Sequence, residues 1–107
     1  MRVWYGNNVL DGLTRGSSRA IHRQLEKVDL VAGQVLHATN EPGRSVYFPA
    51  SGLVTLLARN KRGERLAVGM VGSSGVVGAA DMLGAGSLAF TDAVVQVPGQ
   101  ASRPKTR

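Results

Sequence analysis

The stretch of this chain best suited to binding chemistry runs from Gly72 to Asp81. It reads Gly-Ser-Ser-Gly-Val-Val-Gly-Ala-Ala-Asp, and Asp81 is the only charged residue between Leu66 and Thr91. A long, nearly uncharged stretch punctuated by glycines is typical either of core strands or of a cradle that holds a ligand against the backbone. The base rate for apolar runs favours packing in the core, and both roles stay open for these residues.

Few side chains in the chain are suited to catalysis or metal binding. Asp81 suits either a helix cap or a ligand contact, and the cap is the commoner role. His22 falls on a predicted helix and His37 in a predicted strand, which disfavours a metal pair. Cysteine is absent, which excludes disulfides, thiolate nucleophiles and zinc–thiolate or iron–sulfur sites. We therefore expect no enzyme, no metal and no cofactor.

Two glycine patterns match nucleotide-binding loops only in part. Residues 84–89 spell G-x-G-x-x-A, but no predicted strand precedes them and no predicted helix follows. Residues 72–75 lack the lysine of a phosphate loop and the spacing of a nucleophile elbow. Neither pattern predicts a nucleotide site of these kinds.

The elements that must position the stretch from Gly72 to Asp81 are short. We expect a helical turn or two from residue 7 to 13 and an amphipathic helix over 18–26, where Ile21, Leu25 and Val28 have helical spacing. The apolar period then changes to two, which predicts strands at 28–30, 35–37, 46–48, 53–59, 66–70, 76–77 and 93–97. Glycine and proline predict the turns between them, at 32–33, 40–43, 49–52, 61–64 and 98–99. Such a pattern predicts a sandwich or barrel, and a jelly roll fits it best.

Length and charge limit the remaining possibilities. The 107 residues suffice for one domain with one modest core. The net charge of +6 favours acidic partners, but the cations are scattered and accompany no recognition helix, so we expect solvated faces. No apolar run approaches the roughly 18 residues of a membrane span, and no signal sequence is visible. The expected location is the cytoplasm, with no membrane partner.

The order of the motifs resembles the N-terminal cyclic-nucleotide-binding-like domain of the Crp/Fnr family of transcription regulators. The resemblance rests on Glu41-Pro42-Gly43, on the run from Val46 to Gly52, on the Gly63 turn, on Val71 to Gly78 and on Val95 to Ala101. It implies a mainly β double-stranded β-helix, or jelly roll, preceded by short N-terminal helices. The implied divisions are a leader at 1–6, an effector domain at 7–101 and a basic tail at 102–107.

In this family the domain is followed by a long helix that dimerises and by a helix-turn-helix that reads DNA. Neither follows in this sequence, so we expect a truncated member that contacts DNA only through a missing C-terminal domain. A homodimer is expected only for the full-length form.

The resemblance also places the ligand site. In nucleotide-binding relatives a Gly-Glu-Leu tripeptide opens a short helix that holds the cyclic phosphate, and a downstream arginine neutralises it. Here the tripeptide is Gly78-Ala79-Ala80, and no Lys or Arg occurs from Gly72 to Ala101. The implied ligand-binding residues are Gly75, Val76, Val77, Gly78, Ala79, Ala80 and Asp81. We expect an unknown small-molecule effector and no binding of cAMP in the usual way.

The resemblance thus implies an effector-sensing regulatory domain of a Crp/Fnr-type transcription regulator. One alternative is a stand-alone jelly-roll interaction domain without a ligand. A less favoured alternative is a cupin-like metal enzyme, which would need His and carboxylate ligands clustered at the mouth of the barrel.

Overall fold

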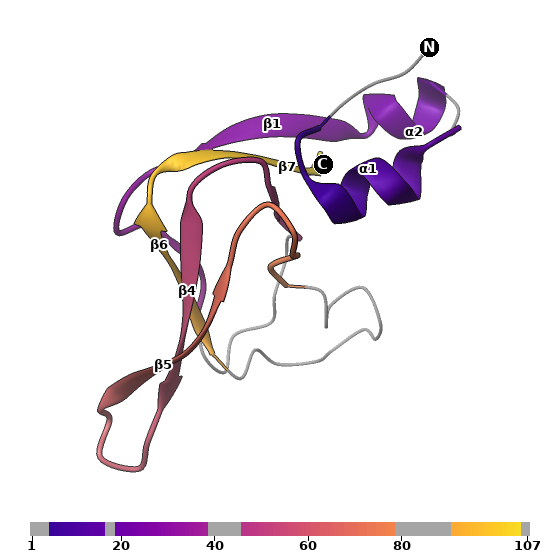
Figure 1. Cartoon of the computed structure of the whole chain (residues 1–107). Coiled ribbons are helices and arrows are strands. Elements are labelled where there is room, and N and C mark those ends of the chain that lie inside the picture. The colour runs from indigo at the N-terminus through magenta and orange to yellow at the C-terminus, as the bar shows by residue number, and fades with distance from the viewer. Residues whose placement is uncertain (1–4, 17–18, 39–45, 79–90, 106–107) are drawn as a thin grey trace.

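Two antiparallel sheets pack face to face and make up most of the molecule, with two short helices at its N-terminal end (Figure 1). The computed structural model describes residues 5–16, 19–38, 46–78 and 91–105. The first sheet has the strand order β1-β7-β3, and the second has the order β2-β6-β4-β5. The mainly β jelly roll predicted from the sequence is confirmed.

The strands are short, and those that begin at Val35, Leu53 and Arg65 each follow a predicted turn. The first sheet contains β1 (Leu25–Leu30), β7 (Gly99–Pro104) and β3 (Phe48–Pro49). The second contains β2 (Val35–His37), β6 (Asp92–Val97), β4 (Leu53–Arg59) and β5 (Arg65–Val71). All neighbouring strands run antiparallel. The turn predicted at residues 40–43 lies outside the described residues.

The main core fills the space between the sheets. Leu30 and Ala101 come from the first sheet, while Val54, Ala93 and Val95 come from the second, and all five are buried. Burying an aliphatic side chain of this size stabilises a fold by about 1.5–3 kcal/mol, so these facing residues hold the two sheets together.

The N-terminal helices are shorter than the sequence predicts. Helix α1 (Asn8–Thr14) matches the turns expected at 7–13, but α2 (Arg19–Arg23) ends early and β1 begins at Leu25. The helix predicted over 18–26 is therefore wrong in its last three residues. Leu25, predicted to be helical, pairs with Pro104 of β7, so pairing across the sheet overrides helical spacing. No described helix is long and apolar enough to cross a membrane.

Packed residues lie beyond both boundaries expected for the domain. Tyr5, expected in a loose leader, is buried with Leu10, Val46 and Phe48 in a second apolar cluster. At the other end β7 continues to Pro104, three residues beyond the boundary expected at 101, and Ser102 in it is buried. Its pairing with β1 explains this, because each strand supplies the hydrogen bonds that the other needs.

Strand β5 corrects the expectation that the apolar stretch after Leu66 packs in the core. The side chains of Leu66, Val68 and Met70 are 69%, 56% and 56% exposed. The strand lies at the edge of its sheet, and a register shift in its pairing with β4, between Leu56 and Leu57, interrupts the alternation of its faces. Farther along the stretch, Val77 is buried in the main core.

Candidate functional site

The loop after β5 brings together four of the seven predicted site residues. It turns at residues 72–75, where the Gly75 amide donates to the Gly72 carbonyl at 3.1 Å. Val77 then exchanges two backbone hydrogen bonds with Tyr47, both 2.9 Å long. We call residues 72–78 the cradle loop. The predicted site residues Ala79, Ala80 and Asp81 lie outside the described residues.

The valines of the cradle loop have packing roles. Val77 belongs to the main core and is 1% exposed, while Val76 packs against the apolar cluster of Tyr5. The side chains of both valines are therefore used for packing within the fold. Gly78 has a φ of +83°, a backbone conformation that favours glycine because a Cβ is strained there. What residues 75–78 can offer to a ligand is therefore their backbone.

Asn7 fixes the position of the cradle loop, and the sequence analysis did not identify it. Its side chain is fully buried, and its Nδ2 donates to the carbonyl oxygens of Pro49 at 2.8 Å and Gly75 at 2.9 Å. Its Oδ1 accepts from the amides of Val9 and Leu10, both at 3.0 Å, and so caps α1. One side chain thus joins three segments of the chain. Its place just before an apolar helix predicts the cap, but no local pattern predicts the other two bonds.

Asn8 adds further contacts between α1 and the cradle loop. Its amide donates to the Ser73 carbonyl at 2.9 Å, and its Nδ2 donates to the Ser74 hydroxyl at 3.0 Å. With the bond from Asn7 to Gly75, three successive loop residues are tied to the start of α1. A movement of the loop must therefore break these bonds or move α1 with it.

Arg103 contacts Tyr47, the backbone partner of the cradle loop, but its charge is already paired. Its Nε donates to Glu26 at 2.9 Å, and its Nη1 donates to the hydroxyl of Tyr47, whose backbone pairs with Val77. The hydrogen bonds to Glu26 and then to Tyr47 raise the pKa of Arg103 above its ordinary value. This guanidinium holds β1, β7 and Tyr47 together.

The two histidines have separate surroundings. His22 on α2 stacks on the Tyr5 ring, with centroids 5.6 Å apart, and its Nδ1 is hydrogen-bonded to the Tyr5 hydroxyl. Burial, followed by the charge of Asp11, raises the pKa of Tyr5. His37 lies on β2. No group of three His, Cys, Asp or Glu that could hold a metal occurs among the described residues.

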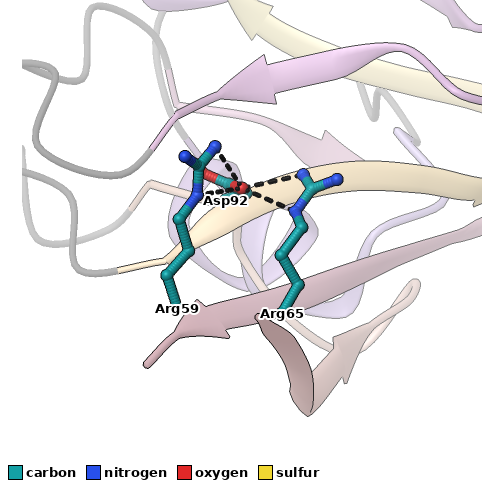
Figure 2. Close-up of polar contacts among 3 residues, drawn as sticks. All are labelled: Arg59, Arg65 and Asp92. Carbon is teal, nitrogen blue, oxygen red and sulfur yellow. Dashed lines mark hydrogen bonds and ion pairs between the residues drawn. The ribbon is translucent and has the colours of Figure 1, made fainter. Parts of the chain in front are cut away.

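A buried carboxylate holds the ends of three strands of the second sheet. Asp92 at the start of β6 is 1% exposed, and its Oδ2 accepts hydrogen bonds from Arg59 at 3.0 and 3.1 Å and from Arg65 at 2.7 and 3.0 Å. Figure 2 shows the two guanidinium groups reaching it from β4 and β5. Charge-assisted bonds of this kind are stronger than neutral ones, so Asp92 fixes the turn end of the β4–β5 hairpin, where β4 ends and β5 begins.

Replacing this carboxylate should weaken the second sheet measurably. We expect Asp92→Asn to lower the free energy of unfolding by about 1–2 kcal/mol, because both arginines are about half exposed and water screens the lost attraction. Urea unfolding measures this change. Glu26→Gln, which removes the ion pair with Arg103, is the matched control and should cost less, since it frees one arginine instead of two. Equal losses in the two variants would contradict the role given to Asp92.

Known proteins share this fold. A family model described as "Cyclic nucleotide-binding domain" matches residues 27–103. No curated sequence matches the chain at a significant level. Many solved structures also match the chain, among them a kinase regulatory subunit, a domain of a transcriptional regulator and a cyclic nucleotide-binding-like protein.

The regulatory subunit of a cAMP-independent protein kinase A from Trypanosoma cruzi, bound to guanosine, is 18% identical with a TM-score of 0.70, over 78% of this chain and 30% of that one. The N-terminal domain of a transcriptional regulator from Streptomyces coelicolor A3(2) is 19% identical with a TM-score of 0.68, over 79% of this chain and 60% of that one. A cyclic nucleotide-binding-like protein from Brucella abortus is 24% identical with a TM-score of 0.70, over 86% of this chain and 81% of that one. The chain spans less than two thirds of the first two proteins, and at these identities the likeness shows the fold.

Proposed function

The chain belongs to the cyclic nucleotide-binding domain family, and from this premise we propose that it is the effector-sensing domain of a Crp/Fnr-type transcription regulator. The family match over residues 27–103 carries the proposal, together with the motif order that resembles the Crp/Fnr regulators. In such a regulator DNA would be contacted by a separate domain, dimerisation would belong to the full-length protein, and the setting would be the cytoplasm.

The effector we propose is a small uncharged molecule. It would lie against the backbone of Gly75 to Gly78 and against Ala79, Ala80 and Asp81. No Lys or Arg occurs between Gly72 and Ala101, and Arg103 is paired with Glu26. A buried phosphate without a cationic partner loses a few kcal/mol of binding free energy. Guanosine, which is bound to the Trypanosoma cruzi protein, is an uncharged probe that differs from cGMP mainly by lacking the phosphate.

Binding would act on the protein through contacts that already exist. The cradle loop is tied to α1 by Asn7 and Asn8, so an effector that prefers one loop position would shift the population of α1 positions. Nothing in this mechanism requires a catalytic residue, which agrees with a regulatory role.

Titration with nucleotides tests the uncharged-effector proposal. We expect no binding of cAMP or cGMP with a dissociation constant below about 10 µM, which corresponds to roughly −7 kcal/mol. Guanosine should bind more tightly than cGMP, because it brings no phosphate to be neutralised. Isothermal titration calorimetry measures both. Tight binding of cGMP would overturn the proposal for this site.

A pair of glycine variants tests whether any ligand found in this way occupies the cradle. Gly78 and Gly63 both have positive φ, +83° and +80°, so a valine at either position strains the backbone similarly. Gly63 lies in the β4–β5 turn with open space around it. We expect Gly78→Val to abolish ligand binding and Gly63→Val to keep it. Equal binding by the two variants would place the ligand elsewhere.

A further inference from the structure

The β4–β5 hairpin projects away from the rest of the jelly roll (Figure 1). Its second strand exposes Leu66, Val68 and Met70, which are three of the seven large hydrophobic residues found exposed in the described structure. Its turn and the strand ends beside it carry Arg59, Lys61, Arg62 and Arg65, all of them exposed. We call these apolar and basic residues together the hairpin surface.

The hairpin surface is rigidly held. The Asn60 side-chain oxygen accepts from the amides of Arg62 at 2.9 Å and Glu64 at 3.0 Å. The Asn60 backbone bonds across the turn to Glu64 and Gly63, both at 3.0 Å. Below the turn, Asp92 fixes Arg59 and Arg65. A preformed surface loses little conformational entropy on binding, which favours recognition.

Charge and polarity decide between the partners that this surface could take. The hairpin surface and the two carboxylates beside it, Glu64 and Asp92, have four positive and two negative charges, a net charge of +2. The same surface on a second copy of the chain would therefore be repelled. A nucleic acid backbone would use the cations but leave the apolar side chains of β5 without a partner. A bilayer would meet a charged turn where an inserting loop needs apolar residues.

We propose that the hairpin surface docks an acidic amphipathic segment of another protein. The carboxylates of the partner would lie against the cations of the turn, chiefly Lys61 and Arg62. Its apolar side chains would lie along the edge strand β5 and cover Leu66 and Met70, which the register places on opposite faces of the sheet, together with Val68 between them. Complementary charge would orient the partner and speed its approach, while the apolar contact would supply most of the binding free energy.

A synthetic helical peptide with a leucine face flanked by glutamates is the probe. We expect it to bind the full chain at least about tenfold more tightly than a scrambled peptide of the same composition, and binding should weaken as salt is raised. Fluorescence anisotropy measures both. An anionic phosphatidylserine vesicle and a DNA duplex are titrated alongside, and sedimentation velocity reports self-association.

Matched variants locate the binding surface. Lys61→Glu with Arg62→Glu should reduce peptide binding about tenfold or more, whereas Arg15→Glu with Arg23→Glu, the same charge change on the N-terminal helices, should leave it unchanged. Leu66→Gln should weaken binding, and Leu13→Gln, at a residue of similar exposure (63%) on α1, should not. The proposal is overturned if the peptide does not bind or if the matched variants have equal effects. It is also overturned if vesicles or DNA bind more tightly than the peptide, or if the chain self-associates and Leu66→Gln abolishes that association.

Discussion

Gly52→Val is expected to lower the free energy of unfolding by about 3 kcal/mol or more, a large fraction of the stability of a domain this small. Gly52 has a φ of +82°, which costs a residue with a side chain about 1–2 kcal/mol. An added Cβ would also overlap the carbonyl oxygen of Val97 and lie 3.0 Å from the carbonyl carbon of Pro98. Both contacts are backbone, so neither can rotate away, and overpacking of this kind adds about 1–3 kcal/mol.

The close approach is mutual, because a Cβ on Gly99 would lie 2.7 Å from the Gly52 nitrogen. The corner before β4 and the connection between β6 and β7 therefore need glycine at both positions. Gly63→Val is the control, since it has the same sign of φ but open space, and it should cost only the backbone strain. Gly52→Ala serves if the valine variant does not fold. Thermal and urea melts in which Gly52 variants lose no more stability than Gly63→Val would contradict the close approach.

Much of the fold could be predicted because its signals are local. The Pro49–Gly52 corner and the Gly63 turn follow from residue types that few other conformations accept, and both glycines have positive φ. The strands of the second sheet could be predicted from apolar residues spaced two apart, although their burial does not alternate regularly. The jelly roll was predictable from these corners and strands taken in order.

The errors arose where distant pairing decides the structure. Leu25 has helical spacing with Ile21, yet it pairs with Pro104 at the other end of the chain. The same pairing turns Ser102 from an expected tail residue into a buried strand residue. Strand β5 is apolar but lies at an edge, and sequence alone gives no information on which strand of a sheet is outermost.

The candidate site could be predicted only in part. Its glycines and its lack of cations are visible in the sequence, and Gly75 to Gly78 do lie on one loop. The ion pair that occupies Arg103 and the three segments that meet at Asn7 depend on contacts between residues 42 to 77 positions apart. Such contacts leave no local pattern, because the partners are far apart in the sequence and those of the Asn7 amide group are backbone carbonyls that every residue has.

Asn7→Asp is expected to have the second large effect, about 3 kcal/mol or more of lost stability. The new carboxyl group keeps the acceptor that caps α1, but it removes both donors from a fully buried site. The carbonyls of Pro49 and Gly75 then face a negative oxygen in place of an amide nitrogen. A buried acceptor left unsatisfied costs about 1–3 kcal/mol, and a buried unpaired charge costs more.

This variant should also acquire a characteristic pH dependence. The facing carbonyls and burial raise the pKa of the new carboxyl group in the folded state above its value in the unfolded chain. The folded variant then holds its proton more tightly, so its stability relative to wild type falls as pH rises through the acid range and stays low at neutral pH. Urea unfolding at several pH values measures this trend.

Asn8→Asp is the matched control for the change in charge. Asn8 is exposed, and its Nδ2 donates to the Ser74 hydroxyl, which can turn to donate to a carboxylate instead. We expect a small effect without marked pH dependence. Hydrogen exchange adds a second measurement: Asn7→Asp should speed exchange in residues 72–77 together with that in α1, because Asn7 joins them. Loss of protection in α1 alone, with the cradle loop unchanged, would show that Asn7 acts as a helix cap and does not hold the loop.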